Sequence, residues 1–130
     1  MRKELSLSAE LICASKFARK GYDIFLPLGE PKNIDFITYK NGQFRRIQIK
    51  TTKPKNGKLR VKLRSTNNWQ NRKYTKEDVD FIVTYDYKND EMYILDMQEF
   101  DGMSEVTLRL EPTKNKQIKG VRLAEQFRFK

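Results

Sequence analysis

Residues 34–50 have the sequence IDFITYKNGQFRRIQIK, which predicts a β-hairpin. Asn41 and Gly42 are typical of a two-residue type I′ turn, because both central residues of that turn need a positive φ. A turn at this place puts Asp35 opposite Gln48 on the facing strand. Because side chains alternate along a strand, Lys50 shares the face of Asp35 and Gln48, and apolar side chains occupy the other face. The hairpin therefore gathers an acid, an amide and an amine at one place.

A helix is predicted before the hairpin, from Leu5 to Arg19, with Ser6 or Ser8 as its N-cap and Gly21 after its end. Its expected apolar stripe consists of Leu7, Leu11, Ala14, Phe17 and Ala18. Glu10 lies one helical step from this stripe. Taken alone, Glu10 is best interpreted as exposed or paired with a lysine, because burying a free carboxylate is costly. The acid and lysine of the hairpin favour a role in a site instead.

The remaining elements follow from alternation and turn residues. Strands are predicted over residues 23–28, 59–64, 81–85, 92–95 and 106–110, and a short amphipathic piece over residues 123–127. In the segment 59–64, apolar residues alternate with basic ones, which predicts a buried face and a basic face.

The residues of the hairpin and the first helix resemble the PD-(D/E)XK nuclease family, in which a helix supplies an acid, one strand an Asp, and the next an acid-x-Lys. The matching positions are Glu10, Asp35 and Gln48-Ile49-Lys50, with Gln48 where most members carry an acid. The chain is most similar to small endonucleases associated with group I introns, which tolerate Gln there and continue with Thr and basic residues, as Lys50-Thr51-Thr52-Lys53 does. The resemblance implies an α/β fold with a PD-(D/E)XK (restriction-endonuclease-like) core: a central mixed β-sheet flanked by the N-terminal helix and further short helices.

The same resemblance implies a metal-dependent site in which Glu10, Asp35, Gln48 and Lys50 are the catalytic residues. A Mg²⁺ ion, for which Mn²⁺ could substitute, would be held by Glu10, Asp35, the Gln48 amide and the Ile49 backbone carbonyl. Lys50 would orient or deprotonate the attacking water. Because Gln48 is neutral, one tightly held ion is expected, with any second ion weak.

The composition excludes several other hydrolases. The chain has no histidine and a single cysteine, Cys13, in an apolar helical pattern. Ser-His-Asp and Cys-His hydrolases and HNH-type nucleases all need an imidazole. One cysteine allows no intramolecular disulfide and no cysteine-rich zinc site. Hydrolysis must therefore rely on carboxylates, lysine and a metal ion.

The length of the chain limits the number of domains, and its charge limits the kinds of partner. The 130 residues form one domain, with the catalytic core at about residues 1–96 and residues 97–130 assigned to subunit or DNA contacts. A net charge of +10 and a pI near 9.7 indicate an anionic polymer or surface as partner. Without a long apolar run or a secretion segment, we expect a soluble cytoplasmic protein with no membrane partner. Double-stranded DNA, not a small molecule, is the expected substrate.

Two polar segments are predicted to contact DNA. Phosphate contacts are assigned to the basic residues after the hairpin, although alternating charge is also typical of a solvated face. These residues are Lys53, Lys55, Lys58, Arg60, Lys62 and Arg64. Base or sugar contacts are assigned to the next polar segment, which could equally be a loop whose tryptophan fills the core. Its members are Asn67, Asn68, Trp69, Gln70, Arg72, Lys73 and Tyr74.

Three functions compete. The first is a sequence-specific double-strand endonuclease of homing type, favoured by the Gln variant and the polar insert. The second is a Holliday-junction resolvase or another structure-specific nuclease, and the third is a non-catalytic DNA-binding module. A basic protein that is not a nuclease is a fourth interpretation. Since one chain has one site, cutting both strands requires a homodimer or homotetramer and a pseudo-palindromic target.

Overall fold

A computed structural model describes residues 3–66, 71–112 and 120–130 of the chain. The N-terminal helix α1 (Lys3–Arg19) precedes a five-stranded sheet with the strand order β1-β2-β3-β7-β8. The strands of this sheet are β1 (Asp23–Phe25), β2 (Phe36–Lys40), β3 (Gln43–Thr52), β7 (Phe81–Asp86) and β8 (Glu91–Asp96). Strands β3 and β7 are parallel and the other pairs are antiparallel, so the sheet is mixed.

Two small sheets and two short helices complete the described fold. Strand β4 (Lys58–Lys62) pairs with β9 (Glu105–Arg109), and β5 (Arg64–Thr66) pairs with β6 (Asn71–Lys73). The short helix α2 (Met97–Phe100) follows β8, and a single 3₁₀ turn, η1 (Ala124–Phe127), lies near the C-terminus. The predicted mixed sheet with an N-terminal helix and few others is confirmed.

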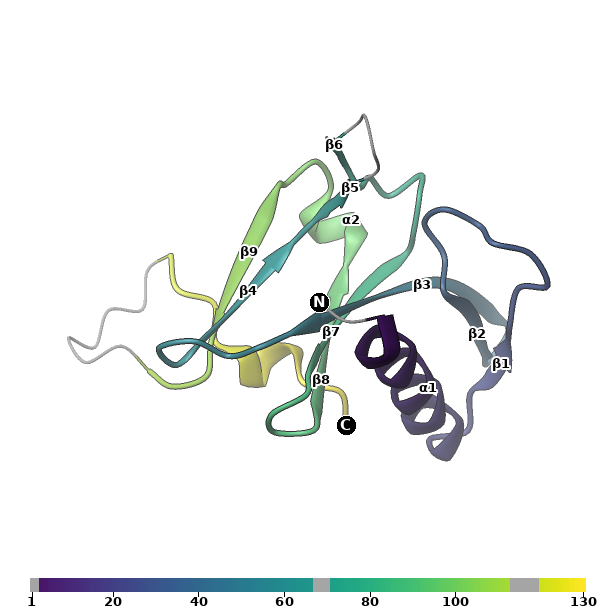
Figure 1. Cartoon of the computed structure of the whole chain (residues 1–130), viewed down its shortest axis with the longest axis horizontal. Coiled ribbons are helices and arrows are strands. Elements are labelled where there is room, and N and C mark those ends of the chain that lie inside the picture. Colours follow the sequence, from purple (N-terminus) through teal and green to yellow (C-terminus); the bar gives the residue numbers. More distant parts are fainter. Residues whose placement is uncertain (1–2, 67–70, 113–119) are drawn as a thin grey trace.

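The central sheet separates two apolar clusters. Figure 1 shows α1 on one side of β3 and β7, and the β4–β9 pair with α2 on the other side. On the α1 side, Ala9, Cys13 and Phe17 pack against a cluster that includes Phe36 and Ile47. The other cluster combines apolar side chains of β4, β7, β8, α2 and β9. The sheet therefore has no face that is wholly open to solvent.

The hairpin forms as its turn residues predict. Asn41 has φ 52° and Gly42 has φ 79°, the two positive values that a type I′ turn needs. Lys40 pairs with Gln43, and the ladder continues in this register to the pair Phe36 and Ile47. The register therefore brings the residue before β2, Asp35, beside β3.

The helix differs from its prediction at its start and in its buried face. It extends back to Lys3, so Ser6 and Ser8 lie inside it and do not cap it. Gly21 does end it, with φ 89° and a hydrogen bond of 3.0 Å from its N–H to the Ala18 carbonyl.

The buried face of α1 is centred on Ala9 and Cys13, which are 1% and 0% exposed. Leu7 and Leu11, predicted to be buried, are each 57% exposed. Small side chains on the contact face let the helix lie close to the sheet, and this close approach turns the larger leucines outward. The predicted apolar stripe is therefore confirmed at Ala14 and Phe17 and wrong at Leu7 and Leu11.

The C-terminal part is built into the core. Strand β9 pairs with β4, and Val106 and Leu108 are 1% and 0% exposed in the same cluster as Leu59 and Val61. Beyond β9, Ala124 of η1 joins that cluster as well. The apolar side chains of this part are therefore used within the chain.

Candidate active site

Asp35 is held beside β3 by two backbone contacts. Its N–H donates to the Ile47 carbonyl over 2.8 Å, and its Oδ2 accepts from the Ile49 N–H over 2.7 Å. The second bond uses a side-chain oxygen where strand pairing would use a main-chain carbonyl. It fixes the Asp35 carboxylate beside β3, at the point where β2 begins.

Glu10 of α1 meets this carboxylate. The pKa of Glu10 is raised from 4.5 to about 7 by burial, by a hydrogen bond with Asp35 and by repulsion from the Asp35 charge. Within residues 3–66, 71–112 and 120–130, neither carboxylate forms an ion pair. The two acids line a hollow of about 570 Å³ together with Glu30. Two adjacent acids without a cation form a site with excess negative charge.

Lys50 supplies the partly buried amine of the site. Burial lowers its pKa, and the charge of Asp35 opposes that shift. Its Nζ donates to the Arg64 carbonyl over 3.1 Å and lies 4.9 Å from the centre of the Tyr74 ring. Lys50 is therefore within electrostatic reach of Asp35, and its amine is held from the side of β5.

Gln48 and Ile49 lie between the acid pair and the lysine. Gln48 Nε2 is 3.5 Å from the Ile49 carbonyl, so the amide and this carbonyl are neighbours. The Ile49 side chain is 7% exposed and packs on the α1 side, while its N–H serves Asp35. The strand thus presents backbone groups of Ile49 and side chains of its two neighbours at one place.

The donor chemistry fits a hard divalent cation. Carboxylate, amide and carbonyl oxygens are the ligands that Mg²⁺ and Mn²⁺ prefer. In the part of the chain that the structure describes, no group of three acidic, histidine or cysteine side chains forms a metal cluster. A cation here would thus depend on two carboxylates, a neutral amide oxygen, a carbonyl and water.

A basic hollow of about 470 Å³ adjoins Lys50. Its basic lining residues are Lys50, Lys53, Arg60, Lys62 and Arg64. Arg60 also forms an ion pair of 3.0 Å with Glu105. Lys58 begins β4, and it pairs with Lys55 across the turn between β3 and β4. The alternation of β4 is confirmed, because Leu59 and Val61 are 0% and 1% exposed.

The polar segment after β5 is described only in part. Asn67, Asn68, Trp69 and Gln70 lie outside the described residues. Arg72 forms an ion pair of 2.9 Å with Asp78, and Lys73 is exposed.

Tyr74 was assigned to base or sugar contacts, and that assignment is wrong. The side chain is only 3% exposed and belongs to the core cluster that includes Leu63. A tyrosine with so little accessible surface has no ring face left for DNA. Its ring instead faces the Lys50 amine.

Arg46 was not singled out from the sequence, although it shares a strand face with Gln48 and Lys50. Its backbone N–H and guanidinium both donate to the Asp80 carboxylate, over 2.7 Å and 3.1 Å. The guanidinium also donates to the carbonyls of Glu77 (2.6 Å) and Lys76 (2.9 Å). Arg46 thus ties the loop before β7 to the strand that carries the site. The sequence signal for Arg46 is its even spacing before Lys50, which places both side chains on the same face of the strand.

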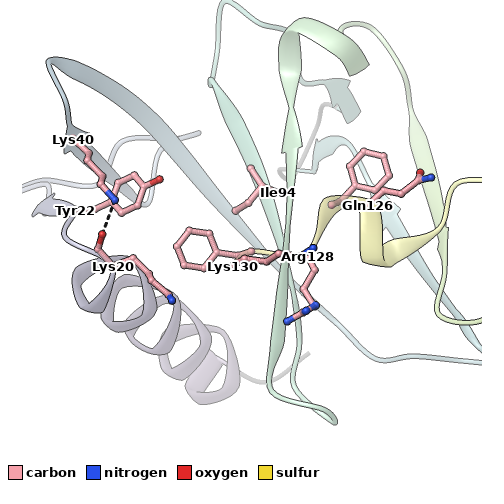
Figure 2. A pocket seen from close by; sticks show the side chains of 9 residues that line it. Lys20, Tyr22, Lys40, Ile94, Gln126, Arg128 and Lys130 are labelled. Atoms are coloured by element: carbon pink, nitrogen blue, oxygen red, sulfur yellow. Dashed lines mark hydrogen bonds between the residues drawn. The ribbon is translucent and has the colours of Figure 1, made fainter.

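A further hollow of about 400 Å³ lies between the end of α1, β2 and the C-terminal residues. Figure 2 shows the Lys40 amine turned to the Tyr22 ring and bonded to the Lys20 carbonyl, whereas Arg128 points away from it. Arg128 also pairs with Glu125 over 2.8 Å. The cationic side chains of this hollow do not converge on one point. None of the residues that line it is a predicted catalytic residue.

The mixed sheet, the acid on α1, the acid directly before β2 and the lysine on β3 form the arrangement that the resemblance to a nuclease family implies. A model of the family described as PD-(D/E)XK endonuclease matches residues 2–130, and the chain belongs to this family. The chain is an endonuclease, and the resemblance found in the sequence is confirmed.

One solved structure and one negative result complete the comparisons. The bacterial homing endonuclease I-Ssp6803I has a similar fold, with a TM-score of 0.76 and 21% sequence identity over 98% of this chain and 89% of that chain. A search of curated protein sequences finds no match. In the described part of the chain, no helix is long and apolar enough to cross a membrane.

Replacing Glu10 by Gln should make the metal-free protein more stable at pH 8 than the wild type. The folded pKa of about 7 exceeds the ordinary value of 4.5, so the stability linked to the Glu10 proton is present below pH 4.5 and lost as the pH rises through 7. Gln cannot ionise and avoids this loss, which is on the order of 1 kcal/mol after solvent screening. Urea unfolding in EDTA at pH 4.5 and pH 8 checks this. An equal difference between the two proteins at both pH values would contradict it.

Proposed function

We propose that this endonuclease is a divalent-metal-dependent, sequence-specific enzyme of homing type that cuts double-stranded DNA. The observation that carries the proposal is the Glu10–Asp35 acid pair, which forms no ion pair in the described chain and in which Asp35 lies within electrostatic reach of Lys50. The basic hollow beside Lys50 supports an anionic substrate. The similarity in fold to a protein described as a homing endonuclease supports the type.

The acid pair, the Gln48 amide oxygen and the Ile49 carbonyl would hold the metal ion. Mg²⁺, with Mn²⁺ as a substitute, would supply charge neutralisation at phosphorus and help for the leaving 3′ oxygen when bound. Asp35 can serve with the oxygen that the Ile49 N–H does not occupy. Because Gln48 is neutral, the site has one negative charge fewer than a site with an acid at this position. The lower charge supports one tightly held ion.

Lys50 acts on the attacking water. An amine can donate to the water oxygen and so orient it, and in its neutral form it can accept a proton. Because burial lowers the pKa of Lys50, the neutral form is more accessible than in an exposed lysine. Its fixed amine would hold the water at one angle to the scissile phosphate.

The duplex backbone would follow the basic hollow. Lys53, directly after β3, Lys62 on β4 and Arg64 on β5 line the hollow, so successive phosphates can meet them in turn. Arg60 shares its charge with Glu105 and contributes less. Base contacts are assigned to Asn67–Gln70, Arg72 and Lys73.

Cutting both strands needs a second copy of the chain. A homodimer or homotetramer with two-fold symmetry presents one site to each strand of a pseudo-palindromic target. Residues 97–130 are the segment that we expected to make this contact. In the part of the chain that the structure describes, exposed large apolar side chains lie outside this segment. They are Leu7, Leu11, Phe25, Leu26, Leu28 and Phe44.

The proposal is tested with a randomised library of linear duplexes and a four-way junction, each incubated with the purified protein in Mg²⁺ and in EDTA. Cutting of a selected subset of duplexes only in Mg²⁺ is the expected result. Paired nicks at the junction alone would replace the proposal with a resolvase. Failure to cut either substrate would overturn the catalytic part and leave DNA binding.

Replacing Arg60 and Lys62 together by Gln should weaken DNA binding and make it less dependent on salt. Each lost phosphate contact lowers the slope of log K against log salt by about 0.9, so the slope should fall by up to about 2. Binding of a duplex recovered from the library, measured by fluorescence anisotropy between low and high salt, checks this.

The matched control changes two exposed basic residues outside the hollow, Arg19 and Lys88, to Gln. It removes the same net charge and should leave the slope nearly unchanged. Equal slopes for the wild type and the Arg60/Lys62 variant would show that these basic residues form a solvated face and do not bind phosphates.

A further inference from the structure

The amine of Lys50 is held by residues that belong to another part of the fold. Lys50 lies on β3, but its Nζ donates to the carbonyl of Arg64, the first residue of β5, over 3.1 Å. The same Nζ lies 4.9 Å from the centre of the ring of Tyr74, which directly follows β6. Both contacts therefore come from the base of the β5–β6 hairpin, where its two strands leave the core.

This base is fixed in place. The Tyr74 N–H donates to the Leu63 carbonyl over 2.9 Å, which closes the hairpin one step before Arg64 pairs with Lys73. Leu63 and Tyr74 are 0% and 3% exposed, so the closure is inside the core. The two partners of the amine cannot move independently of each other.

A second tie joins the same region to β3. Arg46, on the strand face of Lys50, binds Asp80 and the carbonyls of Lys76 and Glu77, in the loop that continues from Tyr74. Thr75 and Asp78 close that loop with a bond of 2.9 Å. The hairpin base is thus attached to β3 on both sides of Gln48.

The two contacts together fix the position of the Lys50 amine, which its long flexible side chain cannot fix alone. Lysine has a strongly hydrated charge on a flexible four-carbon stem, and its rotamers must be restricted before its amine has one position. An aromatic face attracts an ammonium, and the attraction grows when the pair is withdrawn from water. A carbonyl acceptor adds a direction to this attraction.

We propose that Tyr74 is a positioning residue for Lys50. Its ring and the Arg64 carbonyl hold the amine at the angle from which it acts on the attacking water. The β5–β6 hairpin thereby sets the geometry of the cleavage step. This inference rests on the proposed function, which makes Lys50 the group that acts on water. It also connects DNA reading to cleavage, because Arg72 and Lys73, which are assigned to base contacts, lie on β6. The hairpin is then a part of the active site as well as a candidate DNA contact.

The test compares Tyr74→Leu with Tyr74→Phe, which keeps the ring. The substrate is a duplex that the wild type cuts in the library experiment. Single-turnover cleavage at saturating protein and equilibrium binding of the duplex in Ca²⁺ are measured separately, with thermal unfolding as the check on folding. We expect Tyr74→Leu to cut about 10- to 100-fold more slowly, since a misplacement of about 1 Å costs up to about 10²-fold. Its binding constant should stay within about twofold of wild type, and Tyr74→Phe should retain most of the rate.

Several results would overturn the inference. A Tyr74→Leu protein that cuts at the wild-type rate would show that the ring does not position Lys50. Equal losses of rate in the Phe and Leu variants would assign the effect to the hydroxyl. A loss of rate explained by weaker binding or by unfolded protein would make Tyr74 a structural residue only.

A measurement without DNA separates this inference from the proposed function. In protein labelled with ¹³C-lysine, the Lys50 side-chain methylene signal next to the amine is assigned by its loss in Lys50→Met. The ring of Tyr74 should shift this signal upfield, the shift should persist in Tyr74→Phe, and it should vanish in Tyr74→Leu. An unshifted signal in the wild type would refute the geometry, whereas a shifted signal in a protein that cuts no DNA would refute the proposed function alone.

Discussion

The Lys50→Met variant should bind DNA nearly as well as the wild type and cut it at least about 10³-fold more slowly, since positioned acid–base groups contribute about 10²–10⁴-fold. Methionine keeps most of the aliphatic stem that packs beside Tyr74, so the loss falls on the amine alone. The amine is partly buried and interacts with the charge of Asp35. Single-turnover cleavage in Mg²⁺ and anisotropy-based binding check the two halves of the expectation.

The control for Lys50 is Lys88→Met. Lys88 is exposed on the turn between β7 and β8, outside the basic hollow, and its loss removes the same charge. This control should cut at the wild-type rate. Normal cutting by Lys50→Met would show that the active site has been assigned to the wrong lysine.

The Asp35→Asn variant should lose both metal affinity and cleavage. Asparagine is isosteric, and its amide oxygen can still accept from the Ile49 N–H, so β3 keeps its anchor. Because changes around a metal ligand cost about 10–100-fold in affinity, loss of the ligand charge itself should cost at least that much. Calorimetric titration with Mn²⁺ and single-turnover cleavage measure the two losses.

The same variant should also become more stable without metal. Repulsion from Asp35 is one of the causes that raise the pKa of Glu10, so removing the charge relieves the acid pair at pH 8. Loss of activity together with a higher melting temperature in EDTA would separate a site defect from a folding defect. The control is Glu30→Gln, a carboxylate in the same hollow that should change neither readout. Undiminished Mn²⁺ affinity in Asp35→Asn would place the metal elsewhere.

The hairpin shows what local sequence can predict. A type I′ turn depends on two adjacent residues, and the pairing register then follows by counting outward from Asn41 and Gly42. The same counting brings Asp35 to β3 without reference to any distant residue. Local rules therefore suffice for the order of acid, amide and lysine along the two strands.

The helix and Tyr74 show where local rules fail. Several apolar stripes can be drawn on α1, and the choice between Leu7 and Ala9 depends on how close the sheet lies. Tyr74 follows a polar stretch, and only its packing against a cluster from distant strands makes it a core residue that faces Lys50. Likewise, the meeting of Glu10 with Asp35 was implied by the family resemblance and could not come from spacing alone. Contacts between segments far apart in the chain decide all three outcomes.

Crystals soaked in Mn²⁺ and measured for anomalous scattering test the central claim most directly, because they locate the metal without knowledge of the DNA target. The account predicts one strong peak at coordination distance, about 2.0–2.5 Å, from carboxylate oxygens of both Glu10 and Asp35. The peak should be absent from crystals of Asp35→Asn. A map with no peak between these two acids, or with its only peak at other carboxylates, would contradict the assignment of the active site.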